Sequence, residues 1–176
     1  MPLNIGDKAI PFTLPCTDGH VHSLSDWDDR PVLAVIFSCN HCPYARAWED
    51  RIIALQAQFK PQRVKFAVIN ANDPVKYPED SFEEMQKRAK AKGYNFPYLW
   101  DESQEVARAY GATRTPEVFL FDADRRLRYH GAVDDNFEDP DAVQQHYLRD
   151  AIEALLAGQE PPVAQTPAVG CTIKWK

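Results

Sequence analysis

Residues 31–37 of this chain read Pro-Val-Leu-Ala-Val-Ile-Phe, so every position after the proline is apolar. A strand with apolar side chains on both faces is expected where helices or loops cover both sides of its sheet. From Tyr44 to Phe59 the pattern changes, and large apolar residues recur at intervals of three or four. That spacing predicts a helix with one buried face. A buried strand that leads into such a helix favours an α/β fold.

The central part of the chain continues this pattern. Val64–Ile69 is a second apolar strand, and Ser81 with Glu84 forms a capping box at the start of another helix. Residues 117–121 and 127–130 flank a polar turn, which predicts a hairpin. We therefore expect a central mixed β-sheet flanked by helices, with a parallel crossover and an antiparallel edge.

The two ends of the chain have a different composition. Prolines and the turn pair Asp18-Gly19 predict an N-terminal β-hairpin within the first thirty residues. A final helix is expected over residues 139–156. We expect one domain over residues 1–158, followed by an extended, proline-rich C-terminal tail, residues 159–176, which carries Cys171.

Charge and hydropathy exclude several classes of function. The chain has 20 Lys+Arg and 26 Asp+Glu, a net charge of −6, and no basic run, so it is a poor candidate for binding nucleic acid or an anionic membrane surface. Its longest apolar run is far shorter than the roughly 18 residues that indicate a membrane span. The N-terminal residues lack the pattern of a secretory signal, so we expect a cytoplasmic protein.

Cys39-Asn40-His41-Cys42 is a C-x-x-C motif at the predicted junction of strand and helix. Two intervening residues let the sulfurs meet, and a helix N-terminus stabilises a thiolate through its dipole and free N–H groups. A protonated His41 would add to this effect. We expect Cys39, near the helix N-terminus, to attack a disulfide, and Cys42, further into the helix, to resolve the mixed disulfide.

The same cysteines allow other interpretations. His20 and His22 alternate on a predicted strand and could complete a zinc site of two cysteines and two histidines. The pair with His41 could instead hold copper(I) or zinc in a metal-binding module, because thiolates are soft ligands. The two cysteines could also be inert and buried. Cys16 lies outside any motif and is interpreted as structural.

A second feature is Pro116, which stands directly before the apolar strand 117–121. Proline cannot donate to a sheet ladder, so it belongs at the first residue of a strand or at an edge. A tight turn at this point favours a cis peptide bond between Thr115 and Pro116.

Together these features resemble the thioredoxin-fold redoxins, in particular the peroxiredoxin-like (AhpC/TSA-like) and cytochrome-maturation groups. The likeness covers nearly the whole chain and rests on Gly6, Pro11-Phe12, Ser38-Cys-Asn-His-Cys-Pro43, Asn95-Phe-Pro97 and Thr115-Pro116. Bacterial peroxiredoxin-like proteins share the Ser-Cys-Asn-His-Cys-Pro motif. They also share the ending Val-Gly-Cys-x-Ile-Lys-Trp, found here at residues 169–175.

The resemblance implies a thioredoxin-like fold and a thiol–disulfide oxidoreductase that acts through the C-x-x-C pair. It also implies that Pro116 is cis, stands against the active disulfide and keeps metals off the thiols, and that Thr115 offers backbone groups to a peptide substrate. Asn40 and His41 are further candidate substrate contacts. The implied substrate is a disulfide-containing protein or a small thiol. No bound cofactor is expected, because a partner dithiol supplies the electrons.

Two departures from the family patterns bear on the chemistry. Peroxiredoxins carry Pro-x-x-x-Thr-x-x-Cys. If Cys42 took the peroxidatic position, Cys39 would stand at the threonine and Val35 at the proline, so a thiol peroxidase is the alternative function that the motif favours less. Thioredoxin has a buried aspartate at the position of Leu33. This chain therefore needs another proton carrier.

Cytochrome-maturation relatives use a glutamate after the next strand, and the corresponding stretch makes Asp73 the candidate proton relay for Cys42. Glu117, beside the proline, is a weaker candidate. Asp73 can equally be a turn or cap residue.

Cys171 is the candidate third thiol. It ends a proline-rich segment whose Ile173 and Trp175 could anchor it to the domain, so it could reach the active site. There it would capture a mixed disulfide or relay electrons from Cys39. The alternative is a small apolar residue buried beneath the tail.

Overall fold

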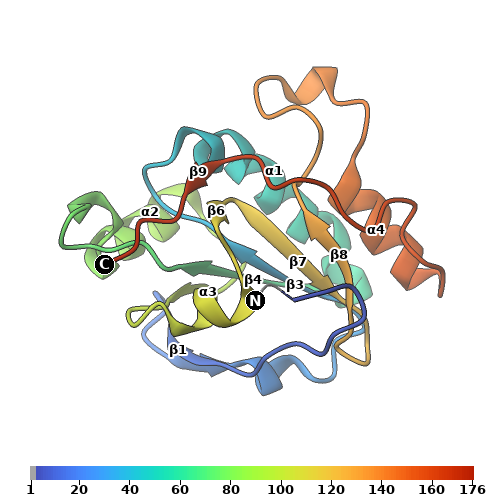
Figure 1. Cartoon of the computed structure of the whole chain (residues 1–176), viewed down its shortest axis with the longest axis horizontal. Helices are drawn as coiled ribbons and strands as arrows, with labels where there is room; N and C mark the ends of the chain where they lie inside the picture. Colours follow the sequence, from blue (N-terminus) through green and yellow to red (C-terminus); the bar gives the residue numbers. More distant parts are fainter. Residues whose placement is uncertain (1–2) are drawn as a thin grey trace.

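The computed structural model describes residues 3–176, so residues 1 and 2 of the predicted domain lie outside it. A five-stranded mixed sheet forms its centre (Figure 1). Its strands, in spatial order, are β5 (Tyr98–Trp100), β4 (Lys65–Asn70), β3 (Leu33–Phe37), β7 (Glu117–Phe121) and β8 (Leu127–Gly131). The first three run parallel to one another, and β7 and β8 add an antiparallel edge. The predicted α/β class with a mixed sheet is confirmed.

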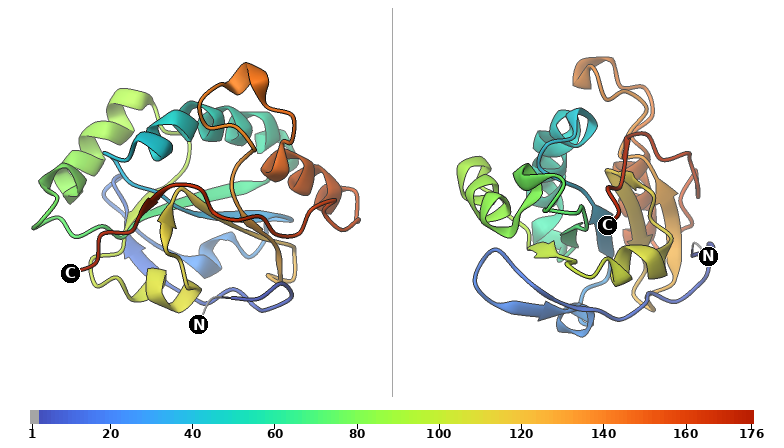
Figure 2. Two further views of the ribbon diagram at one scale, coloured as in Figure 1. Left: turned by 45° about the horizontal axis from the view of Figure 1, so that its top comes forward. Right: turned by 60° about the vertical axis from the view of Figure 1, so that its left-hand side comes forward.

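Both faces of β3 are covered, as its apolar sequence predicts. Ala34 and Ile36 face the core beneath α1 (Pro43–Phe59), α2 (Phe82–Lys92) and α4 (Tyr147–Leu156). The alternate β3 residues face α3 (Glu105–Tyr110) and the N-terminal segment. The left view of Figure 2 shows α1 and α2 above the sheet, with α3 and the N-terminal hairpin below it.

The predicted N-terminal hairpin is confirmed. It consists of β1 (Thr13–Pro15) and β2 (Val21–Ser23), which pair antiparallel. The predicted cap of α2 is also confirmed, because the Ser81 hydroxyl accepts the N–H of Glu84 at 3.2 Å. Within residues 3–176, no helix has the length and apolar character needed to cross a membrane.

The final helix is shorter than predicted. Asp139 caps only the single turn η4 (Pro140–Ala142), and α4 begins at Tyr147. Between them, the Gln144 N–H donates to the Asp135 carboxylate at 3.0 Å, and the Asp135 N–H donates to the Gln145 carbonyl at 3.2 Å. These bonds satisfy backbone groups without a helix, so the helix starts only where its apolar face reaches the core.

The C-terminal tail is packed against the domain. Figure 1 shows it running from α4 past β6 to the neighbourhood of α2. The His130 N–H donates to the Ala164 carbonyl at 3.1 Å, and the Thr166 N–H donates to the His130 carbonyl at 3.0 Å. Further on, β9 (Cys171–Thr172) pairs antiparallel with β6 (Arg114–Thr115). The tail is therefore hydrogen-bonded to β8, the edge strand of the sheet, and to β6, the short strand that precedes β7.

Candidate active site

The C-x-x-C motif forms the turn between β3 and α1. Cys42 is the N-cap residue of α1, and Pro43 is its first helical residue. The Arg46 N–H donates to the Cys42 carbonyl at 2.9 Å. Proline fits the first helical position because its missing N–H would be unpaired there, so it sets the start of the helix. Cys39 therefore lies near the helix N-terminus as expected, but Cys42 caps the helix and does not lie further into it.

Cys42 has the environment of a thiolate. Its pKa is lowered, chiefly because the Cys39 side chain forms a hydrogen bond to it, with further hydrogen bonds from Cys171 and the Ala45 backbone. Burial acts in the opposite direction. The N-terminus of α1 also favours a negative charge at this position. These contacts favour the thiolate form of Cys42.

Cys39 has the environment of a protonated thiol. Its pKa is raised, chiefly by the hydrogen bond to Cys42, and also by burial and by the charge of Asp80. The Cys39 sulfur lies 3.4 Å from the Thr115 hydroxyl oxygen. The sequence predicts that Cys39 attacks and Cys42 resolves, whereas the pKa shifts of the pair favour the thiolate at Cys42.

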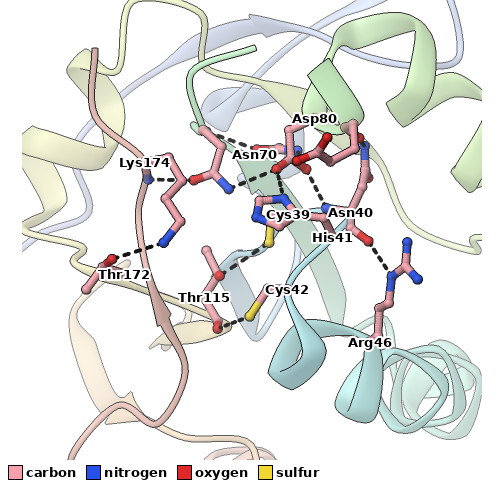
Figure 3. Close-up of polar contacts among 12 residues, drawn as sticks. Cys39, Asn40, His41, Cys42, Arg46, Asn70, Asp80, Thr115, Thr172 and Lys174 are labelled. Carbon is pink, nitrogen blue, oxygen red and sulfur yellow. Dashed lines mark hydrogen bonds and ion pairs between the residues drawn. The ribbon is translucent and has the colours of Figure 1, made fainter. Parts of the chain in front are cut away.

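Thr115 and Pro116 stand opposite the thiols, and the peptide bond between them is cis, as expected. Figure 3 shows both cysteine sulfurs pointing toward Thr115. When protonated, Cys42 donates to the Thr115 carbonyl at 3.5 Å. Thr115 also pairs with Cys171 in the β6–β9 ladder. The backbone edge expected to receive a peptide substrate is therefore occupied by the tail.

A buried carboxylate holds the C-x-x-C turn in place. Asp80 is 0% exposed and accepts the Asn40 N–H at 2.7 Å. It also accepts side-chain N–H groups of Asn70 at 3.2 Å and Asn72 at 3.0 Å, and it pairs with the His41 ring. Sequence reasoning missed Asp80, because an aspartate in the acidic stretch before a helix has the signal of a surface residue.

Asn40 and His41 differ in their access to a substrate. Asn40 is buried, its side-chain oxygen accepts the Tyr98 hydroxyl at 2.7 Å, and its amide donates to the Glu79 carbonyl at 2.9 Å. The structure thus corrects the prediction that Asn40 contacts substrate, since its polar atoms bind other parts of the domain. His41 is partly exposed and stacks on Tyr77, with ring centroids 5.6 Å apart.

Asp73 has the alternative role, that of a turn residue. Its carboxylate accepts the Val75 N–H at 3.0 Å, and its own N–H donates to the Lys174 carbonyl at 2.8 Å. Among the described residues, no hydrogen bond joins Asp73 to either active-site thiol. Asp73 therefore has the contacts of a turn residue, and its role as proton relay stays a prediction.

Glu117, the weaker relay candidate, supports the loop around Pro116. One carboxylate oxygen accepts the N–H groups of Thr113 and Arg114 at 3.0 and 3.1 Å. The other lies 2.6 Å from Nε2 of His130. In the described part of the chain these groups hold both oxygens of Glu117, so it positions Thr115 and does not contact the thiols.

The metal interpretations receive little support from the geometry. Cys39, His41 and Asp80 offer ligand atoms within 4.8 Å of one another, but the Asp80 carboxylate already accepts several hydrogen bonds. His22 lies with Cys16 and Asp18 instead of near the C-x-x-C pair. The structure therefore does not bring His22 to the paired cysteines as the predicted zinc site requires.

The thiols differ in exposure. Cys39 and Cys42 are 3% and 0% exposed. Cys171 packs against this pair but remains partly exposed. Cys16 is buried in a separate cluster, where its backbone forms an isolated antiparallel β-bridge with Leu99 of β5. The structure thus brings three of the four cysteines together and leaves Cys16 apart.

Comparison with known proteins places this site in a family. A sequence model of the AhpC/TSA family matches residues 5–130. The thiol-disulfide oxidoreductase ResA of Geobacillus kaustophilus is 25% identical over 126 residues, covering 70% of this chain and 67% of ResA. Protein Rv2521 of Mycobacterium tuberculosis, whose given name places it among the peroxiredoxins, is 31% identical over 117 residues, 66% of this chain and 69% of its own length.

Two solved structures extend the comparison. A hypothetical protein from Sinorhizobium meliloti 1021 is 38% identical, with a TM-score of 0.94 over 100% of this chain and 97% of its own. The thioredoxin domain of a thiol-disulfide oxidoreductase from Bacteroides vulgatus is 16% identical, with a TM-score of 0.67 over 88% of this chain and 99% of its own. The second match shows that the fold is thioredoxin-like.

Proposed function

The chain belongs to the AhpC/TSA family of thiol-disulfide oxidoreductases and peroxiredoxin-like proteins, and from this premise we propose that it exchanges disulfides through Cys39 and Cys42. The observation that carries the proposal is the position of the pair: Cys42 caps the N-terminus of α1, and both sulfurs lie against Thr115, beside its cis bond to Pro116. A lowered thiol pKa at a helix N-terminus is the arrangement that produces a reactive cysteine at neutral pH.

In the proposed reaction, the Cys42 thiolate attacks one sulfur of a substrate disulfide. A mixed disulfide forms, and the other substrate sulfur leaves as a thiolate. Cys39 then attacks the Cys42 sulfur, which forms the Cys39–Cys42 disulfide and releases the second substrate sulfur, while the Cys39 proton passes to a departing thiolate. An external dithiol returns the pair to the reduced state by the reverse exchange. The substrate is a disulfide-containing protein or a small disulfide.

A thiol peroxidase is the second candidate, and the burial of Cys42 favours it. A sulfur that is 0% exposed is reached more easily by a small oxidant than by a protein disulfide. In that reaction the Cys42 thiolate attacks a peroxide oxygen and becomes a sulfenic acid, and Cys39 displaces hydroxide to form the same disulfide. Peroxide consumption with transient sulfenic acid at Cys42 distinguishes this candidate from disulfide exchange.

An equilibrium titration in glutathione buffers tests the common step. Each sample is trapped with an alkylating agent, and the cysteines are mapped by mass spectrometry. We expect a reversible Cys39–Cys42 disulfide with a potential between about −270 and −120 mV, the range of thioredoxin-fold oxidoreductases. If both cysteines stay reduced across the whole range, the proposed function fails.

A further inference from the structure

Residues 170–172 are built into the wall of the active site. Gly170 approaches the Thr115 backbone so closely that an added Cβ would lie 2.0 Å from the Thr115 carbonyl oxygen. The Arg114 guanidinium donates to the Gly170 carbonyl at 2.9 Å. The next residue, Cys171, is paired in register with Thr115. Only a glycine at position 170 lets the tail reach this edge.

The residues after Cys171 fix the tail on its other side. The Ile173 N–H donates to the Thr113 carbonyl at 2.9 Å, and the Ile173 side chain is 3% exposed. The Lys174 N–H donates to the Asn72 side chain at 2.9 Å. Trp175 lies beneath the Arg108 guanidinium, 4.4 Å from it. Figure 3 shows this stretch passing beside Thr115, so Cys171 is held at a defined place.

That place is beside Cys42. The side chain of Cys171 packs against the pair formed by Cys39 and Cys42, and it is one of the groups that lower the pKa of Cys42. Among the described residues of this thiol cluster, Cys171 is the one with an exposed surface. Cys42 contacts both other thiols, so it is the central member of a series that runs from the interior to the surface.

We propose that Cys171 is a third redox thiol, which carries electrons between an external dithiol and the buried Cys39–Cys42 pair. This inference rests on the proposed disulfide chemistry of that pair and adds the route by which a partner reaches it. Because the tail lies along the backbone edge of Thr115, an electron-donating dithiol meets the partly exposed Cys171 before it meets Cys42.

The relay consists of three exchanges. First, the Cys171 thiolate attacks the Cys42 sulfur of the Cys39–Cys42 disulfide, and Cys39 leaves and takes up a proton. Second, a partner thiolate attacks Cys171 in the new Cys42–Cys171 disulfide, and Cys42 leaves as a thiolate. Third, the second partner thiolate displaces Cys171 and forms the partner disulfide. Two electrons have passed from the partner to the Cys39–Cys42 pair.

The electrostatics suit this direction. In the second exchange Cys42 is the leaving group, and a lowered pKa makes a thiol leave faster. Burial and the neighbouring Cys42 raise the pKa of Cys171 to about 11. Cys42 carries no charge while it is in a disulfide. At the step in which Cys171 attacks that disulfide, the charge of Cys42 therefore no longer raises the pKa of Cys171.

The first test is direct trapping of the Cys42–Cys171 disulfide. Cys39→Ser protein, which keeps a hydroxyl donor beside Cys42, is treated with diamide, alkylated and mapped by mass spectrometry. We expect a Cys42–Cys171 disulfide as the main product, and the same product in the Cys16→Ser, Cys39→Ser double variant. If Cys42 and Cys171 form no mutual disulfide while wild-type protein forms Cys39–Cys42, the relay is refuted and the proposed function stands.

The second test is kinetic and uses Cys171→Ser protein. We expect reduction of its Cys39–Cys42 disulfide by reduced thioredoxin to be slower by about tenfold or more, with an unchanged equilibrium potential, because the exposed entry sulfur is lost while the pair remains. Cys16→Ser is the matched control and should react at the wild-type rate. An unchanged rate in Cys171→Ser overturns the relay. A wild-type pair that never oxidises overturns the proposed function instead.

Discussion

Cys42 and Cys16 are both buried cysteines, but their neighbours differ. Cys42 lies with the thiols of Cys39 and Cys171, whereas Cys16 lies with His22 and Asp18. The pKa of Cys42 is lowered, whereas burial raises the pKa of Cys16. Two buried thiols with different neighbours thus have opposite pKa shifts.

The difference comes from the groups that point at the sulfur. Cys42 receives hydrogen bonds from Cys39, Cys171 and the backbone at the start of a helix. Cys16 lies in a hairpin, where the charge of Asp18 opposes a thiolate. Burial alone therefore makes a thiol inert, and a buried thiol becomes reactive where donors and a helix N-terminus offset the cost of removing its charge from water.

Replacing each thiol in turn is the strongest test of this comparison. Cys42→Ser is expected to lower disulfide turnover by at least about a thousandfold, because it removes the nucleophile. Cys16→Ser should leave turnover within about twofold of wild type, because no reacting group touches it. Steady-state reduction of a small disulfide measures both. Comparable losses in the two variants would contradict the distinction between the clusters.

Removing the donor beside Cys42 should make it resemble Cys16. Cys39→Ala is expected to raise the pKa of Cys42, since the hydrogen bond from Cys39 is the largest cause of its lowering. At pH 6 the alkylation rate of Cys42 should fall once its pKa passes 6, by about tenfold for each further unit of increase. Iodoacetamide labelling across pH, read by mass spectrometry, measures the shift. Cys39→Ser, which retains a donor, should shift less, and an unchanged profile in Cys39→Ala would refute the cause.

The two thiols should also affect stability in opposite pH ranges. The pKa of Cys42 is lowered in the folded protein, whereas the unfolded chain has the ordinary thiol value of about 8.5. Between these two pH values only the unfolded chain holds the proton. The contribution of Cys42 to the free energy of unfolding therefore rises with pH in this range, by at most about 1.4 kcal/mol per unit. This contribution is lost as pH falls through the folded pKa. Cys16 has a raised pKa, so its contribution is complete below about 8.5 and is lost as pH rises.

Urea unfolding under reducing conditions, at several pH values, measures both contributions. Cys42→Ser should flatten the dependence below the ordinary thiol pKa, and Cys16→Ser should change only the alkaline side. A Cys42→Ser curve parallel to that of wild type from pH 5 to pH 8 would show that the folded protein does not favour the thiolate.

The smallest expected effect is a difference in stability between variants of Asp80 and Asp18. Asp80→Asn places an amide against three N–H donors in the interior, and we expect it to lower the free energy of unfolding by about 1–3 kcal/mol. Asp18→Asn, on a side chain that is 47% exposed, should cost about 0.5 kcal/mol or less. Chemical denaturation compares the pair. Equal losses would indicate that Asp80 does not anchor the C-x-x-C turn.

Much of the fold could be predicted because its signals are local. The apolar run of β3, the stripe of α1, the cap at Ser81 and the N-terminal hairpin each depend on neighbours in sequence. The final helix was predicted too long because Asp139 gives a valid cap, whereas the contacts of Asp135 that end the turn come from another part of the loop. Local signals establish that an element exists more securely than they establish its limits.

The features of the active site also depend partly on local sequence and partly on contacts between distant segments. The C-x-x-C pair before a helix and the proline before β7 could be predicted, because short-range spacing sets both. The groups that lower the pKa of Cys42, the hydrogen bond from the turn to Asp80 and the pairing of Cys171 with Thr115 depend on the folded chain. A thiol pKa depends on donors, charges and burial in space, and here these come from segments more than a hundred residues apart in the sequence.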